Sequence, residues 1–391
     1  MNKLKYLLSN SRKFHHLEVA KILYKNNKLS KLICGSPFLN LKENKLSKNL
    51  IDNCYIINSI RHFVPNLEIL KSVHDYLNLL NVKNIDRHAS KYINKADIFI
   101  GLSKTGLETG KLIKKQNKIY VCERSSSHIT FQNEILKNEY SKLGLKYSSI
   151  NKWFIDRELA EYDNADIILT PSRFVEKTFL KHDIKKAKVI NFGSYLDNFY
   201  QLKDIKKKEN EFNILYVGQL SIRKGLHYLI EGFRKFRHPN KRLTIIGPET
   251  KDKLFFHNLL KENNDQNIIY LGTKKHKEIN EYLNKSDVFV LPSLEEGLAT
   301  VTLQAISTGC PVIVSENTGA LEIVKDNKCG FVIPIRNSNI IAEKLTEIVE
   351  DKVLQQEFSE NAVKFSNDYT WENYVENLDR LMENFLKKNQ L

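Results

Sequence analysis

The sequence has 391 residues, of which 41% are apolar and 10% aromatic. This composition excludes an intrinsically disordered chain, which has far fewer large apolar side chains, and the length is enough for two hydrophobic cores. The formal charge of +15 attracts anions, so nucleic acid, anionic lipid and phosphorylated metabolites are candidate partners. Because the lysines are scattered along the chain, an ordinary solvated surface explains the charge equally well.

The chain carries five cysteines that lie far apart and form no CxxC pair: Cys34, Cys54, Cys122, Cys310 and Cys329. This spacing argues against a disulfide framework or a zinc site and favours buried thiols in a reducing compartment. No signal peptide precedes the first expected strand, and no run reaches the roughly 18–20 apolar residues that cross a bilayer. We therefore expect a cytoplasmic protein, either free or peripheral on the inner membrane face.

The first half of the chain alternates short apolar strands with amphipathic helices. Residues 5–9 predict a strand, 16–27 a helix and 31–36 the next strand. Further strands are expected at 97–103, 118–126, 166–172 and 188–193. Strands that alternate with helices in this way are typical of βαβ units and a parallel sheet.

A polar linker at 196–211 separates this half from a second alternation of the same kind. Its run Lys206–Lys208 fits a solvated tether better than a binding site. Strands are expected at 212–218, 242–247, 267–272, 288–293, 311–315 and 331–335, and helices at 338–351, 352–366 and 370–389. The predicted fold class is therefore α/β, with two Rossmann-like doubly wound parallel sheets that face each other across a cleft.

The loop QLSIRKG (219–225) follows the first strand of the second half and leads into a helix. Arg223 and Lys224 stand just before Gly225 at this helix entrance. A helix N-terminus has unpaired N–H groups and a partial positive charge, so added cations make an anion site. The alternative is two ordinary exposed cations. The fingerprints GxGxxG and GxxxxGK[ST] are absent, which disfavours a simple dinucleotide or P-loop NTPase site.

The stretch EEGLATVTLQ (295–304) places carboxylates where a strand gives way to a helix. Glu296 is followed eight positions later by Gln304. Ser293 and Glu296 have the spacing of a capping box, in which the carboxylate would only bind a free backbone N–H. The alternative is that Glu296 faces a ligand in the cleft.

The segment EEGLATVTLQAISTGCPVIVSENTGALEIV (295–324) resembles the signature of retaining nucleotide-sugar glycosyltransferases of the large fourth family, group 1, which have two Rossmann-like domains (the GT-B fold). Their motif is Glu, seven residues, Glu, and Glu296 matches the first glutamate. VGQLSIRKG (217–225) is similar to their phosphate loop. Phe14–His15, ERSSSH (123–128) and the segment 155–180 are similar to parts of their first domain, so the resemblance covers nearly the whole chain.

The resemblance implies a division of labour along the chain. Residues 1–195 would form the acceptor domain, 196–211 the linker and 212–369 the donor domain for the nucleotide sugar. Residues 370–391 would form a helix that crosses back to the first domain. The implied function is retaining transfer of a hexose from a nucleoside-diphosphate sugar to a saccharide or lipid-linked saccharide, in cell-surface polysaccharide synthesis.

The resemblance also assigns roles to individual residues. It implies catalytic roles for Glu296 and His128 and a ribose contact for Gln304. It implies diphosphate binding by Arg223, Lys224 and the backbone N–H groups of Gly297, Leu298 and Ala299. Three more residues, Gln219, Arg124 and His15, are candidates for the cleft.

Several of these positions depart from the family pattern or have a simpler explanation. Gln304 replaces the second glutamate, and Gln219 replaces an arginine that many members carry. His128 also fits a structural hydrogen bond, and Arg124 a pair with Glu123. Because no Asp-x-Asp appears in a suitable loop, the expectation is no metal and no cofactor besides the donor substrate.

Other functions remain open at this point. The glutamines at 219 and 304 are compatible with an inactive sugar-nucleotide-binding homologue, and a sugar-nucleotide epimerase of the same fold is a further alternative. The sequence has no dense Arg/Lys stripe with stacking aromatics, so nucleic acid is not an expected partner.

Overall fold

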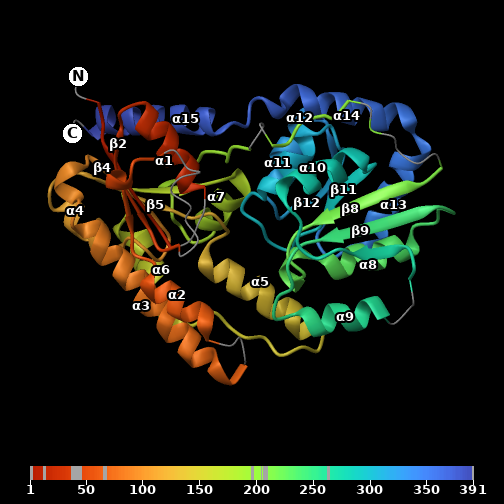
Figure 1. Cartoon of the computed structure of the whole chain (residues 1–391), viewed down its shortest axis with the longest axis horizontal. Helices are drawn as coiled ribbons and strands as arrows, with labels where there is room; N and C mark the ends of the chain where they lie inside the picture. Colours follow the sequence, from red (N-terminus) through yellow and green to blue (C-terminus); the bar gives the residue numbers. More distant parts are fainter. Residues whose placement is uncertain are drawn as a thin grey trace.

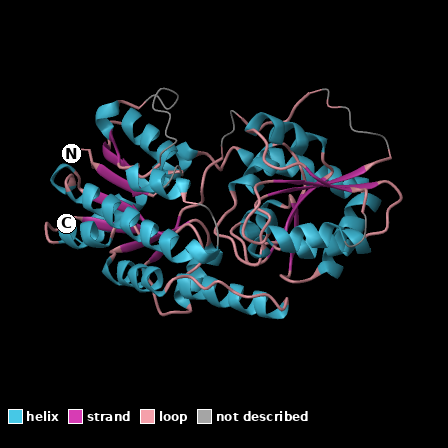
Figure 2. Ribbon diagram, turned by 60° about the horizontal axis from the view of Figure 1, so that its bottom comes forward, coloured by secondary structure: helices cyan, strands magenta, loops and turns pink. Residues whose placement is uncertain are grey.

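The computed structural model shows two α/β lobes side by side (Figure 1). It describes residues 3–11, 15–36, 46–64, 68–194, 198–203, 205, 210–261 and 265–389. In each lobe helices cover both faces of a central sheet (Figure 2). Every pairing between the described strands is parallel, so the predicted fold class is confirmed.

The first lobe contains a seven-stranded sheet in the order β3-β2-β1-β4-β5-β6-β7. Its strands are β1 (Tyr6–Asn10), β2 (Leu29–Cys34), β3 (Ile51–Asn53), β4 (Ile98–Leu102), β5 (Ile119–Glu123), β6 (Ile167–Thr170) and β7 (Ala187–Val189). Its helices are α1 (His16–Lys25), α2 (Ile56–Phe63), α3 (Lys71–Ser90), α4 (Leu107–Lys114), α5 (Ile129–Lys142), α6 (Lys152–Asn164) and α7 (Arg173–Leu180). The central strands β1, β5 and β6 are buried along their whole length, because helices cover both faces.

The second lobe contains a six-stranded sheet in the order β10-β9-β8-β11-β12-β13. Its strands are β8 (Phe212–Val217), β9 (Lys241–Ile246), β10 (Ile268–Tyr270), β11 (Val288–Leu291), β12 (Val312–Ser315) and β13 (Gly330–Ile333). Its helices are α8 (Leu226–Lys235), α9 (Lys253–Lys261), α10 (His276–Lys285), α11 (Thr300–Ser307), α12 (Ala320–Asn327), α13 (Ser338–Glu350) and α14 (Lys352–Ser366).

The last helix, α15 (Trp371–Asn389), returns to the first lobe and packs against α1 (Figure 1). Asp379 accepts a hydrogen bond from the Tyr6 hydroxyl at 2.7 Å and pairs with Lys28 at 2.9 Å. Tyr374 and Leu378 are buried on the packed side of the helix. The chain therefore crosses between the lobes twice, which limits how far they can separate.

Some local expectations differ from the structure. The helices α2 and α3 and the strand β3 were not predicted. The capping box at Ser293 and Glu296 is wrong, because α11 begins only at Thr300 after an irregular loop. Lys206–Lys208 and Phe14 lie outside the described residues, whereas the five cysteines are buried free thiols. Among the described helices, none combines the length and apolar character that crossing a membrane requires.

Candidate active site

The candidate site lies where the strand order of the second sheet reverses. Strands β8 and β11 are neighbours, and the chain leads outward from them to β9 on one side and to β12 on the other. Open parallel sheets bind ligands at this reversal, beyond the carboxyl ends of the strands. The loops 218–225 and 292–299 leave from these ends, and they contain most of the predicted site residues.

The phosphate loop is held in a fixed position against the loop after β11. Residues Ile222–Lys224 form a short 3₁₀ turn, and Gly225 ends it with φ = 67°. A Cβ atom at Gly225 would lie 1.9 Å from the carbonyl oxygen of Pro292, so only glycine fits this close approach. The Arg223 backbone carbonyl accepts from the Leu294 N–H at 2.9 Å. These contacts place Arg223 and Lys224 beside the glutamates at 295 and 296.

Glu296 forms ion pairs with both cations of the phosphate loop. Its carboxylate lies 3.3 Å from Arg223 Nη2 and contacts Lys224 Nζ. Burial raises the pKa of Glu296, but the charges of Arg223 and Lys224 outweigh it and hold the pKa below its ordinary value. The carboxylate is therefore ionised at neutral pH. The structure thus brings together three of the predicted site residues, and their catalytic and binding roles stay predictions.

Glu295 is a site residue that the sequence reasoning missed. It is fully buried and accepts hydrogen bonds from Ser126 Oγ, from the Ser127 N–H at 2.9 Å and from Gln132 Nε2 at 2.9 Å, all in the first lobe. Arg223 Nε donates to it at 2.9 Å within the second lobe. Burial alone would raise the pKa of Glu295. The charge of Arg223 and the hydrogen bonds from Ser126 and Ser127 outweigh this effect, so the pKa lies below its ordinary value. One carboxylate thus joins the two lobes.

The backbone at Gly297 also touches the first lobe. Ser172 Oγ donates to the Gly297 carbonyl oxygen at 2.9 Å. A Cβ atom at Gly297 would lie 1.9 Å from the Ser125 carbonyl oxygen. Leu298 and Ala299 follow as buried residues, and Ala299 is the N-cap of α11. The predicted diphosphate loop therefore lies in contact with both lobes.

Replacing Gly297 by alanine is expected to push the lobes apart at this point, because its methyl group would overlap the Ser125 backbone. Overpacking of this kind costs about 1–3 kcal/mol. We expect a larger radius of gyration in X-ray scattering and a raised donor KM, with little change in the melting of either lobe. Val353→Ala in α14 is the control, since this side chain is 80% exposed. Unchanged scattering and KM would contradict the contact.

Helix α5 carries two further contacts between the lobes, at the end away from His128. Glu139 is buried and pairs with His227 at 3.1 Å, accepts from the Tyr228 hydroxyl at 2.6 Å and pairs with Arg336. The Tyr140 hydroxyl donates to Asp252 at 2.6 Å. In Figure 1, α5 lies between the first sheet and the helices α8 and α9. The lobes are thus closed onto each other along the length of α5.

His128 is the N-cap of α5, and its Nδ1 accepts from the Thr130 N–H at 3.3 Å. The ring is buried and stacks on His182 with centroids 3.9 Å apart. Burial, and then the neighbouring His182 and Arg124, lower the pKa of His128 to about 3, so the imidazole is neutral at physiological pH. Its Nδ1 therefore caps α5, whereas its buried Nε2 makes no hydrogen bond in this structure. A contact with the donor sugar stays a prediction.

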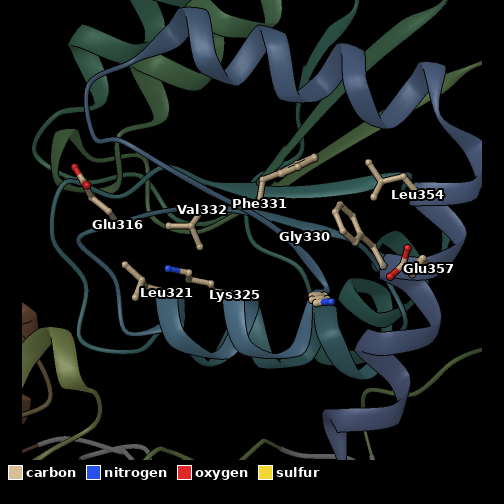
Figure 3. Close-up of a pocket in the computed structure, with 10 residues that line it drawn as sticks. Glu316, Leu321, Lys325, Gly330, Phe331, Val332, Leu354 and Glu357 are labelled. Atoms are coloured by element: carbon tan, nitrogen blue, oxygen red, sulfur yellow. The ribbon is translucent and has the colours of Figure 1, made fainter.

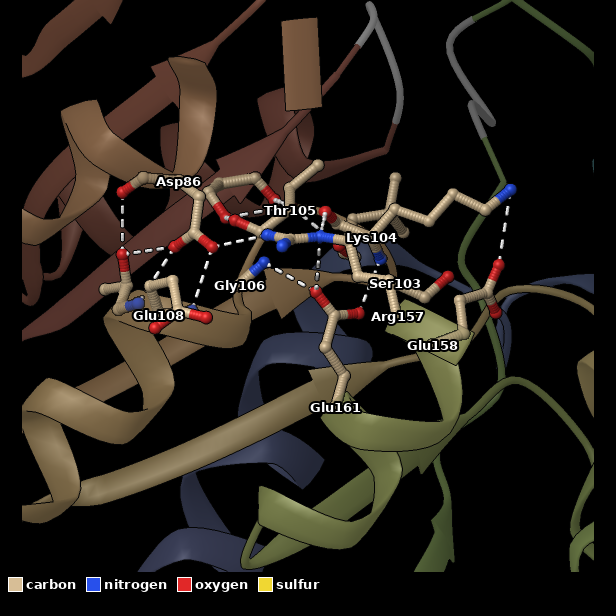
Figure 4. A network of polar contacts seen from close by, with 12 residues as sticks. Asp86, Ser103, Lys104, Thr105, Gly106, Glu108, Arg157, Glu158 and Glu161 are labelled. Atoms are coloured by element: carbon tan, nitrogen blue, oxygen red, sulfur yellow. Dashed lines mark hydrogen bonds and ion pairs between the residues drawn. The ribbon is translucent and has the colours of Figure 1, made fainter. Parts of the chain in front are cut away.

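Arg124 is buried and pairs with Glu158 at 2.9 Å rather than with Glu123, and it donates to Gln132 at 3.0 Å. Glu158 belongs to a polar network in the first lobe that also contains Glu161, Arg157 and Asp86 (Figure 4). Arg124 Nε also donates to the Ser127 carbonyl oxygen at 2.9 Å. Arg124 therefore anchors the serine loop that meets Glu295, while ligand contact by Arg124 stays untested.

His15 lies beneath the returning helix. It is buried, stacks on Trp371 with centroids 5.6 Å apart, and pairs with Glu123, as does His16 at 2.7 Å. The ligand atoms of these two histidines and Glu123 lie within 4.8 Å of one another, so among the described residues this cluster has the donor set for a metal ion. In this structure both imidazoles lie against the Glu123 carboxylate.

The two remaining predicted site residues are Gln304 and Gln219. Gln304 is buried on α11, eight residues after Glu296. Gln219 is exposed after β8, and its carbonyl oxygen accepts from the Tyr216 hydroxyl at 2.7 Å. A separate pocket between α12, β13 and α14 is lined by Phe331, Phe358 and neighbours (Figure 3). None of the predicted site residues lines it.

Comparison with known proteins matches the second lobe to a family. Residues 198–365 match the family of glycosyl transferases group 1. The chain is 27% identical over 276 residues to the capsular polysaccharide biosynthesis glycosyltransferase CapM of Staphylococcus aureus. The aligned region covers 64% of this chain and 71% of CapM.

A second relative is the UDP-Gal:alpha-D-GlcNAc-diphosphoundecaprenol alpha-1,3-galactosyltransferase of Escherichia coli. It is 30% identical over 210 residues, 52% of this chain and 52% of the relative, so the match spans about half of that protein.

The whole chain also has the fold of a solved enzyme. The sucrose-phosphate synthase of Thermosynechococcus elongatus superposes with a TM-score of 0.74 at 16% identity, covering 99% of this chain and 100% of that one. At this identity the likeness shows the fold alone. The chain thus has the GT-B fold, and its residues 198–365 match the family of glycosyl transferases group 1.

Proposed function

We propose that this chain is a retaining glycosyltransferase that moves a hexose from a nucleoside-diphosphate sugar to a saccharide or lipid-linked saccharide, in cell-surface polysaccharide synthesis. The observation that carries the proposal is the contact of Arg223 and Lys224 with Glu296 at the strand reversal of the group 1 domain. The capsular and diphosphoundecaprenol relatives support the substrate classes. A peripheral position on the membrane belongs to the same proposal.

The chemistry that this site must support is charge separation. When the bond between the sugar C1 and the diphosphate oxygen breaks, negative charge grows on the diphosphate and positive charge on the ring. Arg223 and Lys224, with the N–H groups that precede α11, stabilise the leaving diphosphate. The acceptor oxygen bonds to C1 on the same face, and its proton passes to the departing phosphate oxygen.

Donor binding requires an exchange of partners at the cations. In this structure the charges of Arg223 and Lys224 are balanced by Glu295 and Glu296. When the diphosphate replaces Glu296 as the partner of Lys224, the Glu296 carboxylate is free to accept hydrogen bonds from the sugar hydroxyls and to stabilise the developing positive charge. Arg223 keeps its bond to Glu295, which holds the first lobe in place.

A panel assay tests the proposal and separates it from its alternatives. The protein is incubated with nucleoside-diphosphate sugars, with and without lipid-linked acceptor, and nucleotide release and product anomers are followed. Acceptor-dependent release with retained configuration supports it. Binding without turnover would instead identify an inactive homologue, and interconversion of the sugars without acceptor would identify an epimerase. Turnover that survives a chelator is expected, because the sequence has no Asp-x-Asp in a loop that could hold a metal-bound diphosphate.

A further inference from the structure

The first lobe exposes an unusual concentration of large apolar side chains. Among the described residues, thirteen large hydrophobic side chains are exposed, and seven of them fall between Tyr55 and Tyr76. The two most exposed are Phe63 at 87% and Ile69 at 86%. Exposed apolar residues scattered singly are ordinary, but a cluster of this kind marks an interaction surface.

These side chains form two rows with helical spacing. Ile56, Ile60 and Phe63 lie at positions i, i+4 and i+7 of α2, on one face of that helix. Ile69, Val73 and Tyr76 repeat the same spacing along the turn Glu68–Leu70 and the start of α3, which follows it directly. We call these six residues the apolar patch. Helix α2 packs on α3, so the two rows belong to one helix pair (Figure 1).

The apolar patch is bordered by cations from both lobes. Lys71, at the start of α3, is exposed. The loop before α6 connects this end of α3 to Lys251 of the second lobe, because Asn151 Nδ2 donates to Asp75 at 3.2 Å and the Tyr147 ring centroid lies 5.7 Å from Lys251 Nζ. Lys251 in turn lies 5.0 Å from the ring centroid of Tyr140, beside the bond between Tyr140 and Asp252. The apolar patch therefore adjoins the junction of the lobes, next to positive charge.

We infer that the apolar patch and its bordering lysines dock the protein on an anionic lipid bilayer, with α2 and the start of α3 at the depth of the headgroups. This inference rests on the proposed function, because a lipid-linked acceptor must present its saccharide at the interlobe site while its tail stays in the membrane. An amphipathic helix binds such a surface through apolar area and attraction to anionic headgroups. A second copy of this chain would need no anionic lipid.

Vesicle sedimentation tests the docking surface without any need for turnover. The full chain is mixed with vesicles of phosphatidylglycerol and phosphatidylcholine, or of phosphatidylcholine alone. We expect sedimentation with the anionic vesicles, weakened by salt. The double variant F63S/I69S should bind about 10-fold or more weakly, because its apolar contacts are lost. The matched control is Val353→Ser in α14, which is 80% exposed and lies in the other lobe; its binding should equal that of the wild type.

Two further readouts keep this test separate from the enzymatic one. The F63S/I69S variant should retain its melting temperature and its activity on a water-soluble acceptor, and lose activity on acceptor embedded in vesicles. If the wild type sediments but transfers no sugar, the proposed function fails and the docking surface stands. Equal binding by the double variant and the wild type would overturn the docking surface. Conversion of a dimer to a monomer by F63S/I69S, without change in vesicle binding, would assign the apolar patch to self-association instead.

Discussion

Replacing Glu296 by glutamine is expected to lower kcat by about 100- to 1,000-fold, the usual cost of removing one electrostatic group aimed at transition-state charge. The carboxylate pairs with Arg223 and Lys224 and is ionised at neutral pH. The amide keeps the size of the side chain but loses the negative charge that, in the proposed mechanism, attracts the developing positive charge on the sugar. Steady-state kinetics with a competent donor and acceptor measures the effect.

The same variant should alter donor binding much less than turnover. Lys224 loses its partner in the ligand-free state, so it is available to the diphosphate at once, and the donor KM should be unchanged or lower. Glu360→Gln, on the exposed side of α14, is the matched control and should behave as the wild type. A Glu296→Gln enzyme with the wild-type kcat would remove Glu296 from the mechanism.

Replacing Glu295 by glutamine is expected to open the lobes. Its carboxylate accepts from four donors: Ser126, Ser127, Gln132 and Arg223. One amide oxygen cannot replace both carboxylate oxygens, and the amide N–H₂ faces the Arg223 guanidinium. Breaking one side of a buried ion pair costs about 3–5 kcal/mol. X-ray scattering should show an enlarged particle, and the donor KM should rise more than kcat falls.

A surface pair provides the control for this variant. Glu231 and Lys235 form a half-exposed pair on α8, and the loss of such a pair costs at most about 1 kcal/mol. Glu231→Gln should therefore leave the scattering curve unchanged. A Glu295→Gln protein with the scattering curve and donor KM of the wild type would show that this carboxylate does not hold the lobes together.

The depressed pKa of Glu295 also sets the acid limit of the closed arrangement. A carboxyl whose pKa is lowered by folding stabilises the fold above its unfolded pKa of about 4.3, and this contribution is lost only as the pH falls through the lower folded value. The scattering curve of the wild type should therefore stay that of a closed particle at about pH 5.

The fold was largely predictable because the buried strands read as short apolar runs. Strands such as β8 and β11 stand out since both of their faces are covered by helices. Helices α2 and α3 escaped prediction for the opposite reason. Ile56, Ile60 and Phe63 face solvent rather than a core, and α3 has a largely polar composition with little periodicity. The helical spacing of Ile56, Ile60 and Phe63 is present in the sequence, but α2 has only eight residues, which is shorter than the window over which periodicity identifies a helix.

The candidate site was predictable only in part, because motif spacing describes one lobe at a time. The signature located Glu296, Arg223 and Lys224, which the structure brings into contact. It contained no signal for the partners of Glu295, which lie about 165 residues earlier in the chain in a different lobe. The only clue was that Glu295 directly precedes Glu296, so that two carboxylates are adjacent in the sequence. A buried charge without a sequence neighbour to balance it is the signal to look for in such cases.

A crystal structure of the protein with a bound nucleoside diphosphate tests the central claim most directly. We predict that the diphosphate lies between the lobes, within hydrogen-bond distance of Arg223 and Lys224 Nζ and beside the backbone of Gly297–Ala299, with the bond between Lys224 and Glu296 broken. A nucleoside diphosphate that binds with full occupancy away from these residues, for example in the pocket beside Phe331 and Phe358, would contradict the account.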